Sequence, residues 1–104
     1  MDSKHRKGYV CELIAEKYLT DKGLYVFKNS SGLGPIDLIT YNDETKKIQL
    51  IDVKYESLRL TGKKAGTRIN RVKSPRQVGI SINADVDLLY VNDKTGECRT
   101  SNET

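Results

Sequence analysis

The sequence predicts one α/β domain of the α+β type, spanning residues 1–104, in which helices flank a mixed central sheet in the order α-β-β-β-α-β. The N-terminal part has the apolar repeat of an amphipathic helix, short β-branched segments follow it, and a Ser-Pro helix start separates the last two strands. A chain of 104 residues, 37% of them hydrophobic, suffices for one core and not for two.

The first half of the chain is expected to form a helix and three strands. Val10, Ile14 and Tyr18 repeat at i+4 within residues 8–21, and Gly23 then suits a left-handed helix cap. The strands are expected over residues 24–28, 36–41 and 48–55, with a loop at 29–35 and a hairpin turn at 42–46. Alternation in the third strand places Leu50, Asp52 and Lys54 on one face, and Ile51, Val53 and Tyr55 on the other.

The second half is expected to begin with a long basic loop over residues 56–73. Ser74 and Pro75 suit the N-cap and first position of a helix that runs to about residue 83, although its apolar spacing also fits a strand. A fourth strand is expected over residues 87–92, followed by a turn at 93–96 and a brief strand through Cys98.

Positive charge is concentrated in one segment of a chain whose net charge is +4. Residues 57–84 contain no acid and seven cations, which are Arg59, Lys63, Lys64, Arg68, Arg71, Lys73 and Arg76. The other eleven cations face fourteen acids, so the rest of the chain is net negative. We expect this basic segment to follow DNA phosphates, although a solvated loop would have the same composition.

Cysteine content and hydropathy indicate the compartment. Cys11 and Cys98 are expected to be reduced thiols, because two cysteines do not make a disulfide framework. No apolar run approaches membrane-spanning length, and charged residues follow Met1 in place of a signal-peptide core. The protein is therefore expected to be soluble, without a membrane partner, and cytoplasmic, either with the nucleoid or in a host's cytoplasm if phage-encoded.

Two acids are expected in adjacent strands where burial is costly. Asp37 and Asp52 each lie between apolar residues, and the hairpin that joins their strands lets the carboxylates approach each other. A divalent cation would relieve their repulsion, and oxygen ligands without a His or Cys cluster favour Mg²⁺, with Mn²⁺ as its substitute. The alternative is that both acids face solvent on an amphipathic sheet, with Lys54 as a cross-strand partner.

Two further residues complete the candidate catalytic set. Lys54 follows Asp52 on the same face, and Glu12 adds a third carboxylate from the first helix. In phosphodiester hydrolysis a metal would activate water, and an ammonium group would stabilise the negative charge of the transition state. Glu16 lies on the same helix edge as an alternative to Glu12, which is favoured for its spacing from Gly8.

The stretch Gly34-Pro35-Ile36-Asp37 followed by Ile51-Asp52-Val53-Lys54 resembles the PD-(D/E)xK nuclease superfamily, whose core is restriction-endonuclease-like. Lys7-Gly8, three residues and then Glu12 are similar to the first-helix motif of archaeal Holliday-junction resolvases, and Asn29-Ser30-Ser31-Gly32 is similar to their serine-bearing loop. The resemblance covers about residues 5–98 and implies that Asp37, Asp52 and Glu12 bind the metal and that Lys54 aids catalysis. The tail from Asp85 to Glu97 also resembles nucleases related to intron-borne homing endonucleases.

This resemblance implies a Mg²⁺-dependent endonuclease that acts on branched or duplex DNA in recombination, repair or phage-type replication. Within that class we expect a resolvase-like homodimer. The alternatives are a sequence-specific homing or restriction-type endonuclease of the same fold, and a non-catalytic DNA-binding module. Besides the seven cations, Gln77 and Ser31 are candidate DNA contacts, although Gln77 also suits an active-site water or a plain surface position, and Ser31 a loop cap.

Overall fold

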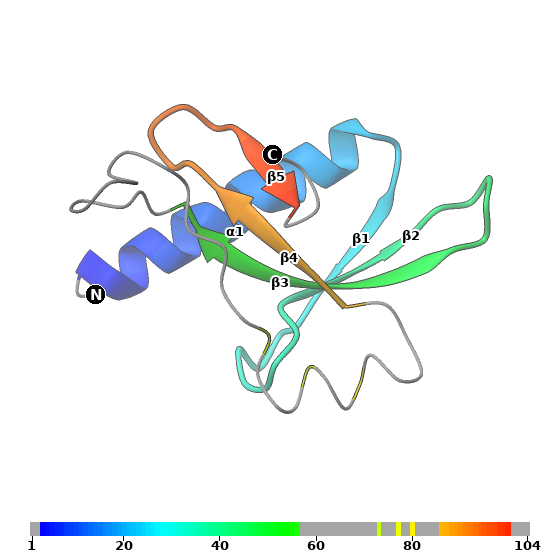
Figure 1. Cartoon of the computed structure of the whole chain (residues 1–104), viewed down its shortest axis with the longest axis horizontal. Helices are drawn as coiled ribbons and strands as arrows, with labels where there is room; N and C mark the ends of the chain where they lie inside the picture. The colour runs from blue at the N-terminus through cyan, green and yellow to red at the C-terminus, as the bar shows by residue number, and fades with distance from the viewer. Residues whose placement is uncertain (1–2, 57–72, 74–76, 78–79, 81–85, 101–104) are drawn as a thin grey trace, which may run out of the picture.

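Five strands form one mixed sheet, and helix α1 packs across one of its faces (Figure 1). The computed structural model describes residues 3–56, 73, 77, 80 and 86–100, with side chains described from His5 onward. The elements are α1 (Ser3–Asp21), β1 (Tyr25–Lys28), β2 (Leu38–Tyr41), β3 (Ile48–Tyr55), β4 (Val86–Val91) and β5 (Cys98–Thr100). The chain is thus a small, compact α+β fold, which confirms the coarse fold class predicted from the sequence.

The strands follow one another in the sheet in chain order, β1-β2-β3-β4-β5. All neighbours are antiparallel except β3 and β4, which run parallel. In the β2–β3 hairpin, Leu38 lies opposite Ile51 and Tyr41 lies opposite Ile48. A parallel pair cannot be joined by a tight turn, so the chain between β3 and β4 has to cross from one end of the sheet to the other.

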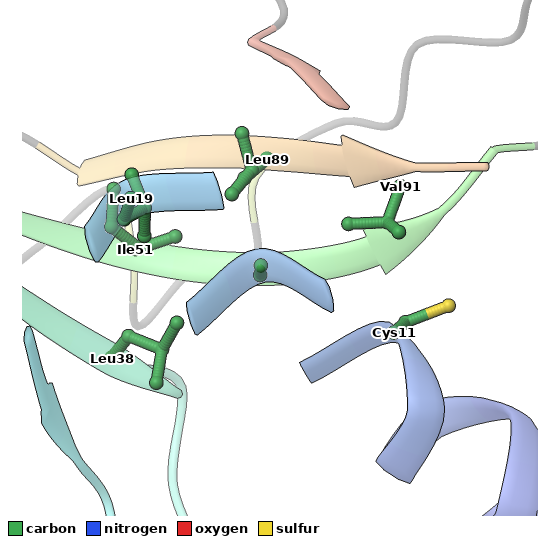
Figure 2. Packing of buried hydrophobic residues seen from close by; sticks show 7 residues of the cluster. Cys11, Leu19, Leu38, Ile51, Leu89 and Val91 are labelled. Carbon is green, nitrogen blue, oxygen red and sulfur yellow. The ribbon is translucent and has the colours of Figure 1, made fainter. Parts of the chain in front are cut away.

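The core lies between α1 and the sheet. Cys11, Ala15 and Leu19 recur at i+4 and form the buried stripe of α1. Figure 2 shows the opposing side chains, which are Leu38 of β2, Ile51 of β3, and Leu89 and Val91 of β4. Burial of each of these large aliphatic side chains stabilises the fold by about 1.5–3 kcal/mol relative to exposure.

Strand alternation then fixes what the other face of the sheet carries. Ile51 and Val53 belong to the core under α1, so Asp52 and Lys54 project from the opposite face. Strand β4 is buried on both faces, because Leu88 and Tyr90 are as inaccessible as its α1-facing residues. An apolar run buried on both faces is typical of a strand that lies inside a sheet with a parallel neighbour.

Strand β3 has the predicted bounds, and the other elements shift at their ends. Helix α1 begins at Ser3 and not at residue 8. The apolar repeat does not predict this earlier start, because the first turns of the helix are polar. Gly23 has φ 87°, which confirms the predicted left-handed cap. β1 begins at Tyr25, and β2 begins only at Leu38, so Asp37 immediately precedes its strand.

The predictions for the second half of the chain are tested only in part, because many of its residues lie outside the described ranges. β4 lies one residue earlier than expected, and β5 extends the brief strand to Thr100. Of the predicted helix over residues 74–83, only Gln77 and Ile80 belong to the described residues, and both are helical. The predicted basic loop lies outside the described residues except for its ends, Glu56 and Lys73.

Both cysteines are free thiols, as expected. Cys11 is buried under the sheet, and burial raises the pKa of the Cys98 thiol to about 11. Protonated, part-buried thiols are poor nucleophiles, so neither cysteine is a candidate for catalysis. In the described part of the chain, no helix combines the length and apolarity that crossing a membrane requires.

Candidate active site

Asp37 is held rigidly at the point where the β2–β3 ladder ends. Its N–H donates to the Ile51 carbonyl at 2.9 Å, and its carbonyl accepts from the Asn29 N–H at 2.9 Å. Its carboxyl oxygen Oδ2 accepts a further hydrogen bond from the Val53 N–H at 2.8 Å. Because these bonds tie both backbone and side chain to neighbouring strands, the Asp37 carboxyl has little freedom to turn away from β3.

Asp37 and Asp52 meet on the same face of the sheet. Leu38 pairs with Ile51, so one step further along the hairpin Asp37 lies opposite Asp52. The Asp52 carboxyl lies close enough to raise the pKa of Asp37, and the protonated form of Asp37 is thereby favoured beside it. The alternative in which both acids face solvent is wrong, because Asp52 is 7% exposed.

Burial and the neighbouring Asp52 shift the pKa of Asp37. Burial is the largest cause and the hydrogen bond with Asp52 the second, and together they raise the pKa of Asp37 to about 7. The Val53 N–H opposes the rise, while the negative charges of Asp52 and Glu12 add to it. A carboxyl that is half protonated near neutral pH is poised to release its proton when a cation approaches.

Two donors fix the other side of Asp52. Lys54 lies two residues along β3, and its Nζ is 3.2 Å from Asp52 Oδ2. The same oxygen accepts a 2.6 Å hydrogen bond from Nε2 of Gln77. Lys54 remains 36% exposed, so its ammonium can also reach an anion in solvent. Acid, amide and ammonium therefore form one connected cluster on the face opposite α1.

Gln77 is buried, which corrects its interpretation as a plain surface residue. Its side chain is 4% exposed, and Nε2 donates to the Pro35 carbonyl at 2.8 Å as well as to Asp52. The two acceptors lie on different segments, so Gln77 fastens the loop before Asp37 to the middle of β3. A DNA contact by Gln77 stays a prediction. Hydrophobic patterning could not find this link, which joins residues 25 positions apart through polar atoms alone.

The two candidate glutamates on α1 differ in their surroundings. Glu12 is half-buried, and its charge acts on Asp37. One carboxylate oxygen of Glu16, Oε2, is instead buried and lies 3.3 Å from the Lys28 ammonium on β1. Glu12 thus affects Asp37 only through the smallest of the effects on the pKa of Asp37, and the structure brings Asp37, Asp52 and Lys54 together without Glu12.

The donor set suits a hard divalent cation. Two carboxylates that repel each other are brought together by the backbone, and Mg²⁺ is typically held by one or two protein carboxylates with waters and phosphate oxygens. Within the described ranges, no three acid, histidine or cysteine side chains already converge as a metal-binding group. Asp37 and Asp52 are thus the residues that would hold such an ion.

The remaining predicted DNA contacts are only partly placed. Ser31 is exposed, and its hydroxyl donates to Asn29 Oδ1 while accepting from the Leu33 N–H, so it stabilises the loop before Asp37. Lys73 is half-buried. The other predicted contacts lie outside the described residues, and these are Arg59, Lys63, Lys64, Arg68, Arg71 and Arg76.

Comparisons of the chain with protein-family models, with curated proteins and with solved structures found no match.

Proposed function

We propose that this protein is a Mg²⁺-dependent DNA endonuclease that hydrolyses phosphodiester bonds, with the sheet serving as a restriction-endonuclease-like core of the PD-(D/E)xK type. The observation that carries the proposal is the Asp37–Asp52 pair, in which two acids 15 residues apart lie opposite each other across the hairpin, beside the Lys54 ammonium. Such a pair costs stability unless a cation binds there, so its presence in the fold argues for function.

Each residue of the cluster has a distinct task in this proposal. Asp37 and Asp52 would hold Mg²⁺, with Mn²⁺ as a substitute, and Glu12, on the α1 side of the sheet, would add its negative charge from a distance. The bound ion supplies an activated water and neutralises charge on the phosphate. Lys54 is half-exposed next to Asp52, which lets its ammonium hydrogen-bond to a phosphate oxygen and stabilise the charge that develops there. Gln77 keeps Asp52 turned toward Asp37.

The basic segment supplies the affinity for DNA in this proposal. Its seven cations follow β3 in the sequence, and Gln77, which follows the last of them, is bonded to Asp52. Cations that are tethered there can hold the DNA backbone while the acids act on one phosphate. We propose branched DNA as the preferred substrate and a homodimer as the active species, because a four-way junction requires two matched incisions.

A cleavage assay tests the proposal. Four-way junction, flap and linear duplex DNA are incubated with the protein in Mg²⁺, Mn²⁺ or EDTA. We expect cleavage of branched DNA in either metal, loss of cleavage in Asp52→Asn and Lys54→Ala with binding largely kept, and no effect of Asp43→Asn at the exposed β2–β3 turn. Cutting of one site in linear duplex would indicate a sequence-specific enzyme instead. No cleavage of any DNA would leave a non-catalytic binding module and contradict the proposal.

A further inference from the structure

A pocket of about 250 Å³ lies beside Asp37, where β1 ends and β2 begins. It is lined by Phe27, Lys28, Asn29, Ile36, Asp37, Leu38 and Ile39. This volume falls just below the roughly 300–1,000 Å³ of sites for drug-sized ligands, and so suits one flat ring system. Because Asp37 forms part of its wall, whatever enters the pocket lies next to the carboxylate pair.

Phe27 is the aromatic residue of this pocket. Its neighbour Val26 packs against the core under α1, so alternation turns Phe27 to the opposite face, which also carries Asp37 and Asp52. Phe27 pairs with Ile39 and is thereby the diagonal cross-strand neighbour of Asp37. The side chains of Phe27 and Ile39 are 58% and 40% exposed, so apolar surface is open to solvent immediately beside the acids.

The polar groups of the pocket lie away from Phe27 or are already bonded. Lys28 alternates with Phe27 along β1, so it lies on the α1 face, where its part-exposed ammonium is 3.3 Å from Glu16. The Asn29 amide donates to the carbonyls of Leu33 and Ile36. On the face that carries Phe27 and Ile39, an aromatic ring and aliphatic groups therefore remain open to a ligand, and these favour a planar ring.

We propose that the pocket binds the unstacked base of a nucleotide adjacent to the phosphate that the carboxylate pair cleaves, with the base stacked on Phe27. This inference rests on the proposed endonuclease function and defines its substrate more closely. A base inside a duplex reaches the pocket only by leaving its stack, so DNA with unpaired bases at a branch, flap or single-stranded end binds better than linear duplex. Since the Asn29 amide is committed, the pocket accepts any base by stacking and has no sequence preference.

Fluorescence of an unpaired base tests the proposal directly. Flap DNA carries 2-aminopurine at the unpaired nucleotide next to the branch and is titrated with the full chain in Ca²⁺. We expect quenching on binding and a shift of affinity of about 5- to 150-fold toward weaker binding in Phe27→Ala. Phe27→Trp restores both signals because it restores an aromatic face.

Tyr25→Ala is the matched control. Tyr25 lies two residues earlier on the same strand and face, and it is also 58% exposed, but it stacks on Tyr41 and does not line the pocket. We expect Tyr25→Ala to leave quenching and affinity unchanged. Equal behaviour of Phe27→Ala and Tyr25→Ala would overturn the proposal. A second outcome would also overturn it: the base is not quenched, and both variants self-associate more weakly than the wild type in sedimentation. This face of the sheet would then be an interface between two copies of the chain.

The outcome for the pocket is separable from that for the proposed function. If the wild type cleaves flap DNA in Mg²⁺ and Phe27→Ala cleaves it equally well, the pocket proposal fails and the endonuclease stands. If the wild type cleaves no DNA, the endonuclease fails, and quenching that depends on Phe27 still decides whether the pocket binds a base.

Discussion

At the scale of single residues, Asp37 and Asp52 define both the chemistry and the cost of the site. Like charges directly opposite each other across two strands destabilise a sheet, and here burial adds to the penalty. The sequence predicted that a hairpin would let these acids approach, because each interrupts an apolar run in adjacent strands. The raised pKa of Asp37 and its hydrogen bond from the Val53 N–H depend on the register of the hairpin, which composition does not specify.

Asp37 makes the metal-free protein less stable as pH rises. The pKa of Asp37 is about 7 in the folded chain and 3.8 in the unfolded chain, so the folded state binds more protons between these values. This contribution to stability is fully present below pH about 4 and is lost as pH rises through about 7. In EDTA we expect a melting temperature that falls between pH 5 and 8, and a rise of about 5 °C at pH 8 in Asp37→Asn.

Thermal unfolding by circular dichroism in EDTA measures this, with Asp43→Asn as the control acid that is exposed and paired with Lys46. Asparagine can still accept from the Val53 N–H, so packing is kept. Equal pH dependence of wild type and Asp37→Asn would contradict the assignment.

Gln77 positions Asp52, and its loss should affect metal use more than DNA binding. Gln77→Ala removes donors from Asp52 Oδ2 and from the Pro35 carbonyl, and we expect a 10- to 100-fold loss of cleavage or of Mg²⁺ affinity, as is typical of residues that orient metal ligands. The check is the Mg²⁺ concentration that gives half-maximal cleavage, measured with DNA affinity at the same temperature. A uniform loss of folded protein with unchanged Mg²⁺ dependence would reduce Gln77 to a structural role.

At the scale of elements, the apolar period of helices and the alternation of strands predict most of the described elements. The bounds of β3 are predicted to the residue because Asp52 and Lys54 alternate with the apolar residues Ile51, Val53 and Tyr55. The apolar period does not predict the N-terminal turns of α1, because Lys4, His5 and Arg6 are compatible with a helix but do not form an apolar face.

Helix α1 offers an internal comparison between its two candidate acids. We expect Glu12→Gln to lower cleavage and raise the Mg²⁺ requirement, because the charge of Glu12 already acts on Asp37. Glu16→Gln should retain cleavage, since Glu16 is paired with Lys28. A Mg²⁺ titration of cleavage with both variants decides the question, and greater sensitivity of Glu16→Gln would reverse the assignment.

The junction of β3, β4 and β5 is stabilised by a buried ion pair. Arg99 donates to both carboxylate oxygens of Glu56, at 2.8 and 3.1 Å, and its guanidinium also lies over the Tyr90 ring. Arg99→Met should cost about 3 kcal/mol of unfolding free energy, because it leaves the Glu56 carboxylate in a buried setting without its cation.

Urea unfolding measures this loss, with the exposed Lys17–Asp21 pair as the comparison. Lys17→Met should produce no measurable change, because exposed ion pairs contribute little to stability. A similar effect of both substitutions would show that burial does not control the strength of the Arg99 pair.

At the scale of the whole molecule, charge is divided between a basic segment and a net acidic remainder. The sequence alone predicts this division, since residues 57–84 hold seven cations and no acid. It does not predict how the segment is anchored, because the contacts of Glu56 with Arg99 and of Gln77 with Asp52 join polar residues far apart in the chain. Polar pairing over such separations leaves no periodic trace in the sequence.

Salt dependence reports on the basic segment. We expect log affinity for DNA to fall linearly with log salt, and the slope to become shallower by up to about 2 in the double variant Lys63→Gln, Lys64→Gln. The control is Lys46→Gln with Lys47→Gln at the β2–β3 turn, which should leave the slope unchanged. Fluorescence anisotropy at several ionic strengths measures it. Equal slopes for the two double variants would show that the basic segment does not contact the DNA backbone.

The raised pKa of Asp37 beside Asp52 also has a practical consequence for laboratory evolution. A selection for heat resistance in alkaline buffer with chelator will enrich chains in which an amide replaces one of these acids. Under the proposed endonuclease function those variants will not cleave DNA, and variants that are both heat-resistant and active will come from the same library only when divalent salt is present throughout the selection.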